Sequence, residues 1–380
     1  MNFYEFFAGG GMARLGLGAS WRCAFANDID SMKAASYRSY FDGADELRIG
    51  DVAEVLPSDL PGHADLAWAS FPCQDLSLAG NGGGLKGKRS GTFWLFWKLI
   101  QALGREGRPP KTIVLENVQG AVTSHKGRDF AAICEVLAEE DYQYAPLVID
   151  AQYFLPQSRP RLFIVGFKKP EAAPPASLLG MYPASPWHPD SFGLAYNQLS
   201  DKARASWTWL RLPTPAKRES RLADIIEQEP AGVEWHSPFE TKRLLTMMSP
   251  LNREKVAQAK RASQRMMGAV YKRTRKDSNG AKCQRAEVRF DDVAGCLRTP
   301  AGGSSRQIIL VVEGKRVRSR LFSPREAARL MGLPEDYTLP KRYNDAYRLA
   351  GDGVAVPVVE WLARHVIEPA LITIAAEEVA

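Results

Sequence analysis

The sequence contains 380 residues, of which 45% are hydrophobic, so the chain can bury a large core and is long enough for two domains. It shows neither a signal-peptide pattern nor an apolar run near the roughly 18 residues of a membrane span, which excludes these two classes and favours a cytosolic protein. The formal net charge of +7 at pH 7 favours a polyanionic partner.

Strand and helix patterns alternate from residue 1 to about 168. Strands are predicted at residues 3–9, 21–30, 64–70, 112–118, 145–154 and 161–167. Helices are predicted at residues 11–20, 31–41, 91–104 and around 130–137. This alternation is typical of an α/β domain with a doubly wound, mostly parallel sheet that helices cover on both faces. Ligands of such sheets bind beyond the carboxyl ends of the strands.

The texture of the sequence changes after residue 168, where a proline-rich segment predicts a domain boundary. Residues 169 to about 318 show no clear alternation of strands and helices. Within them, residues 251–290 hold twelve Lys or Arg against three Asp or Glu. This basic stretch favours contacts with phosphates, although a solvated helix face would look the same. Near the end, a Ser-capped helix is predicted at 323–337, followed by a glycine turn at 351–353 and a last helix.

A glycine-rich turn at residues 7–16 joins the first predicted strand to the first helix. Such a turn lets a ligand approach the backbone, but its spacing fits neither the phosphate loop nor clearly the dinucleotide fingerprint. Asp28 lies at the end of the strand at 21–30, where a carboxylate can hold two ribose hydroxyls, and Asp51 lies at a further strand end, in IGDV at 49–52. The pattern indicates a nucleoside-containing cofactor, and S-adenosylmethionine fits it.

Cys73 follows the strand at 64–70 and precedes a glycine-rich loop, so we expect its thiol at the same edge of the sheet. One interpretation is a nucleophilic thiolate, and the other is an incidental cysteine that acts as a small hydrophobe. The five cysteines are scattered, with no pair at metal-ligand spacing, so we expect neither disulfides nor a metal site.

Polar residues also end the next two strands. Glu116 and Asn117 interrupt the buried apolar run at 112–118, and Arg159 and Arg161 follow the next predicted strand, at 145–154. Alone, the first pair could be a strand-end cap and the second a surface salt bridge. Their succession at one sheet edge instead favours a catalytic site.

In their order and sequence, these motifs resemble those of DNA cytosine-5 methyltransferases of the bacterial type. The similar segments are FFAGGG at 6–11, FPCQ at 71–74, ENV at 116–118, QSRPR at 157–161, SPREAARLMGLPEDY at 323–337 and GDGVAVPVV at 351–359. Only residues from about 170 to 290 are left unmatched, in the region that reads the target sequence in this family. The resemblance implies a Rossmann-like class I methyltransferase domain formed by residues 1–168 plus about 338–380. It implies a smaller, irregular target-recognition domain at 169–337, including the return helix.

The resemblance also implies roles for individual residues. The nucleophile is Cys73, the acid bound to the target ring is Glu116, and Arg161 with Arg159 orients the site. The implied cofactor residues are Phe7, Gly9, Gly11, Asp28, Ile29, Asp51, Val52, Pro72 and Asp352. The implied DNA contacts are Gln74, Ser77, Lys272, Arg273, Arg275, Arg298, Ser304 and Arg306.

This sequence departs from the family pattern at four positions. Glu5 replaces a common Asp before the glycine turn, and Ile29 replaces an aromatic residue beside the adenine. Asp352 and Gly353 stand where Asn and Ser or Ala are usual, so a carboxylate is added near the expected cofactor site.

The resemblance implies methyl transfer from S-adenosylmethionine to carbon 5 of a flipped-out cytosine in a specific duplex DNA sequence, by a restriction-modification or orphan methylase. We expect a monomer, located in the bacterial cytoplasm at the nucleoid, with a cognate restriction endonuclease as a possible partner. A tRNA cytosine-5 methyltransferase and a catalytically inactive DNA-binding relative stay open as alternatives. A zinc-dependent base deaminase is disfavoured, because its H-x-E and C-x-x-C ligands are missing.

Overall fold

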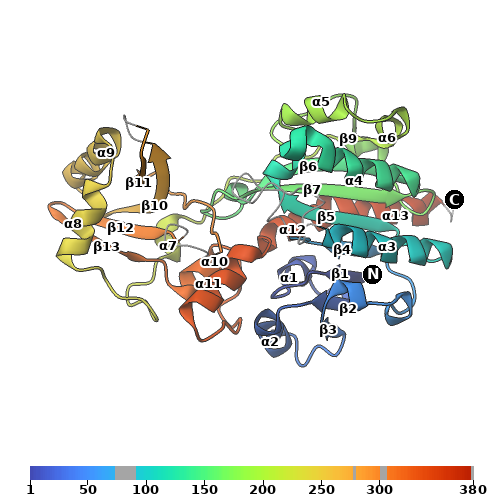
Figure 1. Cartoon of the computed structure of the whole chain (residues 1–380), viewed down its shortest axis with the longest axis horizontal. Helices are drawn as coiled ribbons and strands as arrows, with labels where there is room; N and C mark the ends of the chain where they lie inside the picture. The colour runs from blue at the N-terminus through green and yellow to red at the C-terminus, as the bar shows by residue number, and fades with distance from the viewer. Residues whose placement is uncertain (73–90, 277–279, 300–305, 378–380) are drawn as a thin grey trace. The chain divides into compact units, whose positions relative to one another are not determined.

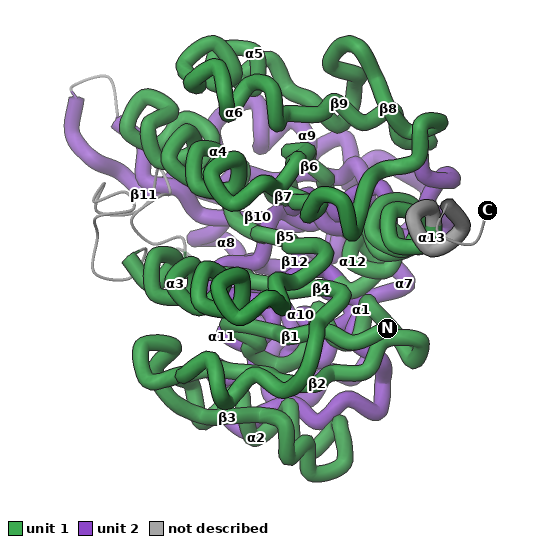
Figure 2. The backbone as a smooth tube through the Cα atoms, turned by 90° about the vertical axis from the view of Figure 1, so that its right-hand side faces the viewer, with its two compact units in different colours: residues 1–150, 160–214, 356–380 green, residues 151–159, 215–355 purple. Residues whose placement is uncertain are grey.

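The computed structural model describes residues 1–72, 91–276, 280–299 and 306–377. The chain forms two compact units, which Figure 2 shows in different colours. Unit 1 comprises residues 1–150, 160–214 and 356–380, and unit 2 comprises residues 151–159 and 215–355. Among the described residues, no helix has both the length and the apolar character needed to cross a membrane.

Unit 1 is built on a seven-stranded sheet with the strand order β3-β2-β1-β4-β5-β7-β6 (Figure 1). The strands are β1 (Asn2–Phe6), β2 (Arg22–Asp28), β3 (Leu47–Ile49), β4 (Leu66–Ala69), β5 (Thr112–Val118), β6 (Tyr142–Asp150) and β7 (Pro160–Lys168). Only β7 runs antiparallel to its neighbours β5 and β6, and the other pairs are parallel. The predicted doubly wound, mostly parallel sheet is therefore confirmed.

Successive side chains of β1 point to opposite faces of the sheet, and each face is covered by a layer of helices. Tyr4 and Phe6 of β1 point into a core that also contains the buried faces of two long helices, α3 (Thr92–Arg105) and α4 (Arg128–Glu139). The intervening Glu5 contacts the opposite layer, formed by α1 (Met12–Leu17), α2 (Ser31–Tyr40) and α12 (Val356–Leu362). Gly16 allows α1 to pack on α12, because a Cβ there would lie 2.4 Å from Cβ of Val359.

Residues 169–214 belong to unit 1, although the sequence predicted a domain boundary at 168. They form β8 (Leu179–Gly180), α5 (Ser191–Tyr196), α6 (Asp201–Ser206) and β9 (Trp209–Leu210). Trp207 packs edge-on against Phe130 of α4, and the hydroxyl of Tyr144 in β6 donates to the carbonyl of Ala203. These buried contacts hold the segment on the sheet, despite its many prolines. The last helix of unit 1 is α13 (Glu368–Glu377).

Unit 2 contains a four-stranded antiparallel sheet with the order β11-β10-β12-β13. Its strands are β10 (Met266–Lys276), β11 (Lys282–Arg289), β12 (Ile308–Glu313) and β13 (Arg316–Leu321). Two helices, α8 (Pro238–Thr246) and α9 (Pro250–Arg261), share its apolar core. The unit is thus more regular than predicted, and most of the basic stretch forms a β-hairpin rather than a helix face.

The remaining helices of unit 2 are α7 (Leu222–Ile225), α10 (Pro324–Arg329) and α11 (Tyr343–Asp352). The Ser cap is confirmed, since the Ser323 hydroxyl accepts from the Glu326 amide and Pro324 occupies the first turn. The helix itself is shorter than the predicted range of 323–337, because it ends at Arg329. Helix α11 lies in unit 2, whereas the sequence predicted that the catalytic domain resumes at about residue 338. The Tyr343 hydroxyl of α11 donates to the carbonyl of Phe322, which is also in unit 2. Gly351 and Asp352 form the end of this helix rather than the predicted glycine turn.

Candidate active site at the carboxyl edge of the sheet

The glycine turn follows β1 and is left-handed at three positions. Phe7 has φ 58°, Gly9 has φ 56° and Gly11 has φ 74°. A Cβ on Gly11 would lie 2.4 Å from the Phe41 ring, so glycine is required there for packing of α2. A Cβ on Gly9 would meet only the Lys33 side chain, at 3.9 Å. The space over Gly9 is therefore open to the close approach of a ligand.

Two carboxylates end the neighbouring strands. Asp28 is 8% exposed, and its two oxygens accept from the amides of Gly9 and Asp30, each at 2.7 Å. These contacts fix the end of β2 against the glycine turn, and burial raises the pKa of Asp28. Asp51 is exposed after β3 and accepts from the Ala53 amide at 2.9 Å. Both acids thus lie at the predicted edge of the sheet.

Two apolar residues that were predicted to contact the cofactor differ in exposure. Val52 is buried, whereas the Ile29 side chain is 69% exposed. Pro72 is half-buried at the end of the described segment that follows β4.

Glu5 lies under the glycine turn, where it is 1% exposed. Its carboxyl oxygens accept from the Arg14 amide at 3.4 Å and the Tyr37 hydroxyl at 3.3 Å. Burial raises the pKa of Glu5 to about 8. Glu5 therefore joins β1 to α1 and α2, and it supports the turn from below.

Glu116 and Arg161 meet at the carboxyl end of β5. The Arg161 Nε atom lies 3.3 Å from Oε1 of Glu116, and both side chains are largely buried, at 14% and 8% exposed. Asn117 donates from its amide to the carbonyl of Phe71 at 3.1 Å, which ties β5 to the chain just before Pro72. Two of the predicted catalytic residues are thus side by side. Cys73, Gln74 and Ser77 lie outside the described residues.

Arg159 has contacts that the sequence did not predict. It is 1% exposed, and its guanidinium donates to the carbonyls of Leu297 at 3.1 Å, Gly351 at 2.9 Å and Gly353 at 2.6 Å. A buried guanidinium needs such acceptors, and here it joins three chain segments of unit 2. These contacts assign Arg159 a structural role in addition to the catalytic role that the resemblance implies.

Asp352 is bound within unit 2. Its carboxylate accepts from the Thr299 hydroxyl, and Oδ2 lies 3.7 Å from Nε of Arg348. Thr299 follows Arg298, which is exposed. The carboxylate that distinguishes this chain from the family pattern therefore has partners inside the protein.

The other predicted DNA contacts lie in unit 2. Arg306 donates to the Asn344 side chain at 2.6 Å and lies over the Tyr343 ring. Lys272, Arg273 and Arg275 lie on β10, while Ser304 is outside the described residues. Arg285 lies directly opposite Arg273 in the register of the hairpin, a neighbour that could not be predicted because strand register is not visible in the sequence.

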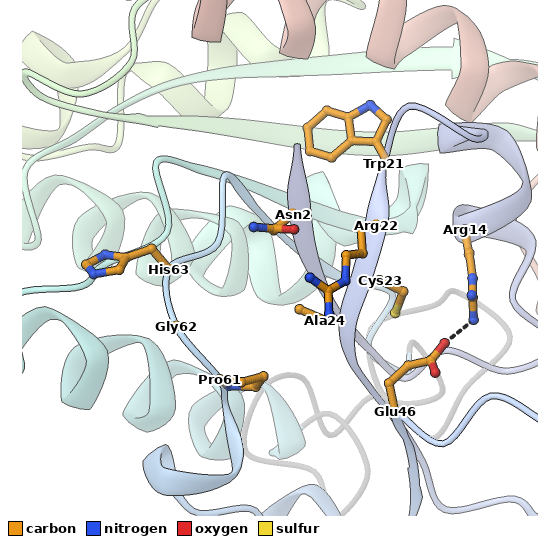
Figure 3. A pocket seen from close by; sticks show the side chains of 10 residues that line it. All are labelled: Asn2, Arg14, Trp21, Arg22, Cys23, Ala24, Glu46, Pro61, Gly62 and His63. Atoms are coloured by element: carbon orange, nitrogen blue, oxygen red, sulfur yellow. Dashed lines mark hydrogen bonds and ion pairs between the residues drawn. The ribbon is translucent and has the colours of Figure 1, made fainter.

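A hollow of about 580 Å³ lies at the opposite edge of the sheet (Figure 3). Its lining includes Asn2 and Arg22, at the amino ends of β1 and β2, and the ion-paired Arg14 and Glu46. None of the predicted cofactor residues lines it. In the described part of the chain there is also no cluster of three or more His, Cys, Asp or Glu side chains able to hold a metal ion.

Comparisons with known proteins agree with this fold. Solved structures that cover the chain include S. pombe Dnmt2 methyltransferase, with a TM-score of 0.60, 17% identity and 99% of each chain covered. A putative prophage-encoded DNA modification methyltransferase from E. coli gives a TM-score of 0.56, 17% identity and the same coverage. Unit 1 thus has the Rossmann-like fold of methyltransferases.

The sequence comparisons define the family. The profile of the C-5 cytosine-specific DNA methylase family matches residues 1–368, so the chain belongs to this family and is a DNA cytosine-5 methyltransferase. Among curated relatives, the Type II methyltransferase M1.ScrFI of Lactococcus lactis subsp. cremoris is 27% identical over 96% of this chain and 77% of its own length. M.HpaII of Haemophilus parainfluenzae is 26% identical over 97% of this chain and 89% of its own.

Proposed function

We propose that this enzyme transfers a methyl group from S-adenosylmethionine to carbon 5 of a cytosine that is flipped out of duplex DNA, through a covalent bond to Cys73. The observation that carries the proposal is the buried Glu116–Arg161 pair at the carboxyl edge of the sheet that also carries Asp28 and the open glycine turn. An acid, a fixed cation and a ligand-accepting turn at one sheet edge are what this reaction requires.

The residues at the glycine turn fit a nucleoside cofactor. The open space over Gly9 admits the ligand close to the backbone, Asp28 would accept from the ribose hydroxyls, and Asp51 from the adenine amino group. Phe7, Ile29, Val52 and Pro72 would supply apolar contacts to the adenine. When bound, S-adenosylmethionine supplies a methyl group on a positively charged sulfur.

The residues of the chain activate the base, because carbon 5 of cytosine is a poor nucleophile. The Cys73 thiolate forms a bond to carbon 6, and the electron pair of the C5–C6 double bond moves toward carbon 5. The protonated carboxyl of Glu116 would donate to N3 and accept from the exocyclic amine, and it would thereby stabilise the negative charge that develops on the ring. Carbon 5 then bonds to the methyl group with this electron pair, while the bond from the methyl group to sulfur breaks and its electron pair stays on sulfur, which becomes neutral. Loss of the carbon 5 proton to a base, with departure of the thiolate, restores the double bond and the free enzyme.

The Arg161 guanidinium would hold the Glu116 carboxyl in position and add positive charge beside the ring. The thiolate must reach the face of the base, so the cytosine has to leave the stack at a cost of a few kcal/mol. We infer that unit 1 catalyses methyl transfer and that unit 2 recognises and binds the duplex. We also infer a monomer of the bacterial cytoplasm, acting at the nucleoid. The Type II names of the relatives support a partner restriction endonuclease.

Transfer of labelled methyl groups tests the proposal. Purified enzyme with labelled S-adenosylmethionine should label duplex DNA and leave tRNA unlabelled. Sequencing of bisulfite-converted DNA from an expressing host should then show protected cytosines in one recurring sequence. Labelling of tRNA alone would show that the substrate is RNA. Absence of label from both substrates would refute the proposal.

A further inference from the structure

The hairpin of β10 and β11 extends beyond the sheet of unit 2 (Figure 1). The neighbouring β12 pairs only with Met266–Val270 of β10, whereas β11 pairs with β10 as far as Lys276. On the other side, β11 is the edge strand, and α8 is followed by a single bridge from Met248 to Ala286. From the level of Ala286 toward the turn of the hairpin, the described residues therefore form a ribbon of only two strands. Its strand segments, residues 272–276 and 282–286, are called the ribbon below.

The ribbon is strongly basic, and most of its side chains are exposed. It holds six cations, and the nearest acid on these strands is Glu287, which pairs with Arg275 at 2.7 Å and with Arg273 at 3.8 Å. Asp277 follows Lys276 in the sequence, but two carboxylates cannot balance six cations, so the ribbon attracts a polyanion. The six cations are Lys272, Arg273, Arg275, Lys276, Lys282 and Arg285.

Like charges face each other on both sides of the ribbon. Arg273 is directly opposite Arg285 on one face, and Lys276 is opposite Lys282 on the other. Directly opposed like charges destabilise a strand pair, so an anion bound beside these two pairs would stabilise the ribbon. Positive charge on both faces suits a ribbon that lies between two phosphate backbones.

One cross-strand pair of the ribbon is polar and uncharged. Thr274 lies opposite Gln284, between the two like-charge pairs, and both side chains are exposed. A glutamine amide can donate and accept together, which matches the edge of adenine, and a threonine can bond to any base or contact the thymine methyl group. This pair has the chemistry of base recognition.

We propose that the ribbon enters the major groove of duplex DNA, where Gln284 and Thr274 contact base edges and determine the methylated sequence. The inference rests on the proposed function. The major groove, about 12 Å wide, admits a two-stranded ribbon and presents a pattern of donors and acceptors that distinguishes all four base pairs, whereas the pattern of the minor groove, about 6 Å wide, is degenerate. The Arg273–Arg285 and Lys276–Lys282 pairs contact the phosphates on either side.

The first experiment measures binding to a duplex of random sequence against salt concentration. Arg273→Gln and Arg285→Gln should each weaken binding to all duplexes alike and reduce the salt slope by about 1. Arg316→Gln is the matched control, because Arg316 is exposed on β13, at the opposite edge of the same sheet. Slopes for the two ribbon variants equal to that of the control would overturn the phosphate contacts.

The second experiment profiles the methylated sites in a library of random duplexes. Gln284→Ala should lower the preference for the favoured sequence over its single-base variants at one or two positions, by about tenfold, since a good base contact discriminates by about 1–3 kcal/mol. Gln258→Ala is the control, because Gln258 is exposed on α9, and its profile of methylated sites should equal that of wild type. An unchanged profile for Gln284→Ala would overturn the assignment.

The outcomes separate this inference from the proposed function. A wild-type enzyme that methylates no duplex would refute the proposed function. A wild-type enzyme that methylates one sequence, with ribbon variants that bind and select as wild type does, would refute only the role of the ribbon. Melting temperatures of the variants should match that of wild type, because each replaced side chain is exposed.

Discussion

The Nε atom of Arg161 lies 3.3 Å from Oε1 of Glu116, although the two residues belong to opposite ends of their strands. Glu116 is near the carboxyl end of β5, and Arg161 is near the amino end of β7. They meet because β7 runs antiparallel to β5, with Arg161 opposite Val118. A parallel β7 would have placed Arg161 at the far edge of the sheet. The one reversed strand therefore brings a cation to the acid.

We predict that Arg161→Ala lowers the rate of methyl transfer by about 10²–10³-fold, because the fixed cation beside the reacting ring is lost. Single-turnover transfer of labelled methyl groups to DNA measures this rate. Arg22→Ala is the control, since Arg22 is exposed at the amino end of β2, the opposite edge of the same sheet. A variant folded as judged by its melting temperature, yet as fast as the control, would contradict the role of Arg161.

Cys73→Ala should abolish methylation and leave the affinity for S-adenosylmethionine unchanged, because the thiolate bonds to the base and not to the cofactor. Cys23→Ala is the matched control. Cys23 is buried, and burial raises the pKa of its thiol to about 12, so it cannot supply a thiolate near neutral pH. Methylation assays and calorimetric cofactor binding check the pair of variants. Methyl transfer by the Cys73 variant would refute the covalent route.

The sequence was sufficient for the parts of this enzyme that depend on local pattern. Strand ends follow from apolar runs, and parallel strands bring their ends to one edge, so Asp28, Asp51 and Glu116 could be assigned to that edge in advance. The partners of Arg159 could not be predicted, because they are main-chain carbonyls more than 130 residues away, and a carbonyl leaves no mark on the sequence. The ribbon was missed because both its faces are exposed, so β10 and β11 lack the apolar alternation of a half-buried strand there.

The contact between Asp352 and Thr299 predicts a coupled pair. Asp352→Ala and Thr299→Val should each lower the free energy of unfolding, and the double variant should lose less than the sum, with a coupling of about 0.5–3 kcal/mol. Denaturant unfolding of the four proteins measures the cycle. Affinity for S-adenosylmethionine should stay equal in both single variants. Weaker cofactor binding in Asp352→Ala alone, with additive stabilities, would show that Asp352 serves the cofactor instead.

Glu5 is a buried acid, and its ionisation should affect the free energy of unfolding. Its neighbours are the Arg14 amide and Tyr37 hydroxyl, which bond to it, while Asp28 and Cys23 lie near. Burial is the main cause that raises its pKa, and the contacts with Arg14 and Tyr37 oppose it. The folded protein therefore holds a proton on Glu5 at a pH where the unfolded chain has lost it.

We predict that Glu5→Gln changes the pH dependence of stability. The pKa of Glu5 rises from 4.5 in the unfolded chain to about 8 in the folded protein. The contribution of protonated Glu5 is complete below pH 4.5 and declines, by at most about 1.4 kcal/mol per pH unit, as the pH rises to 8. The glutamine variant keeps a neutral group, so its unfolding free energy should gain on wild type steadily between pH 5 and pH 8. Denaturant unfolding across this range measures the difference, with the exposed Glu54→Gln as control. A difference that stays constant with pH would show that Glu5 is ionised in the folded protein.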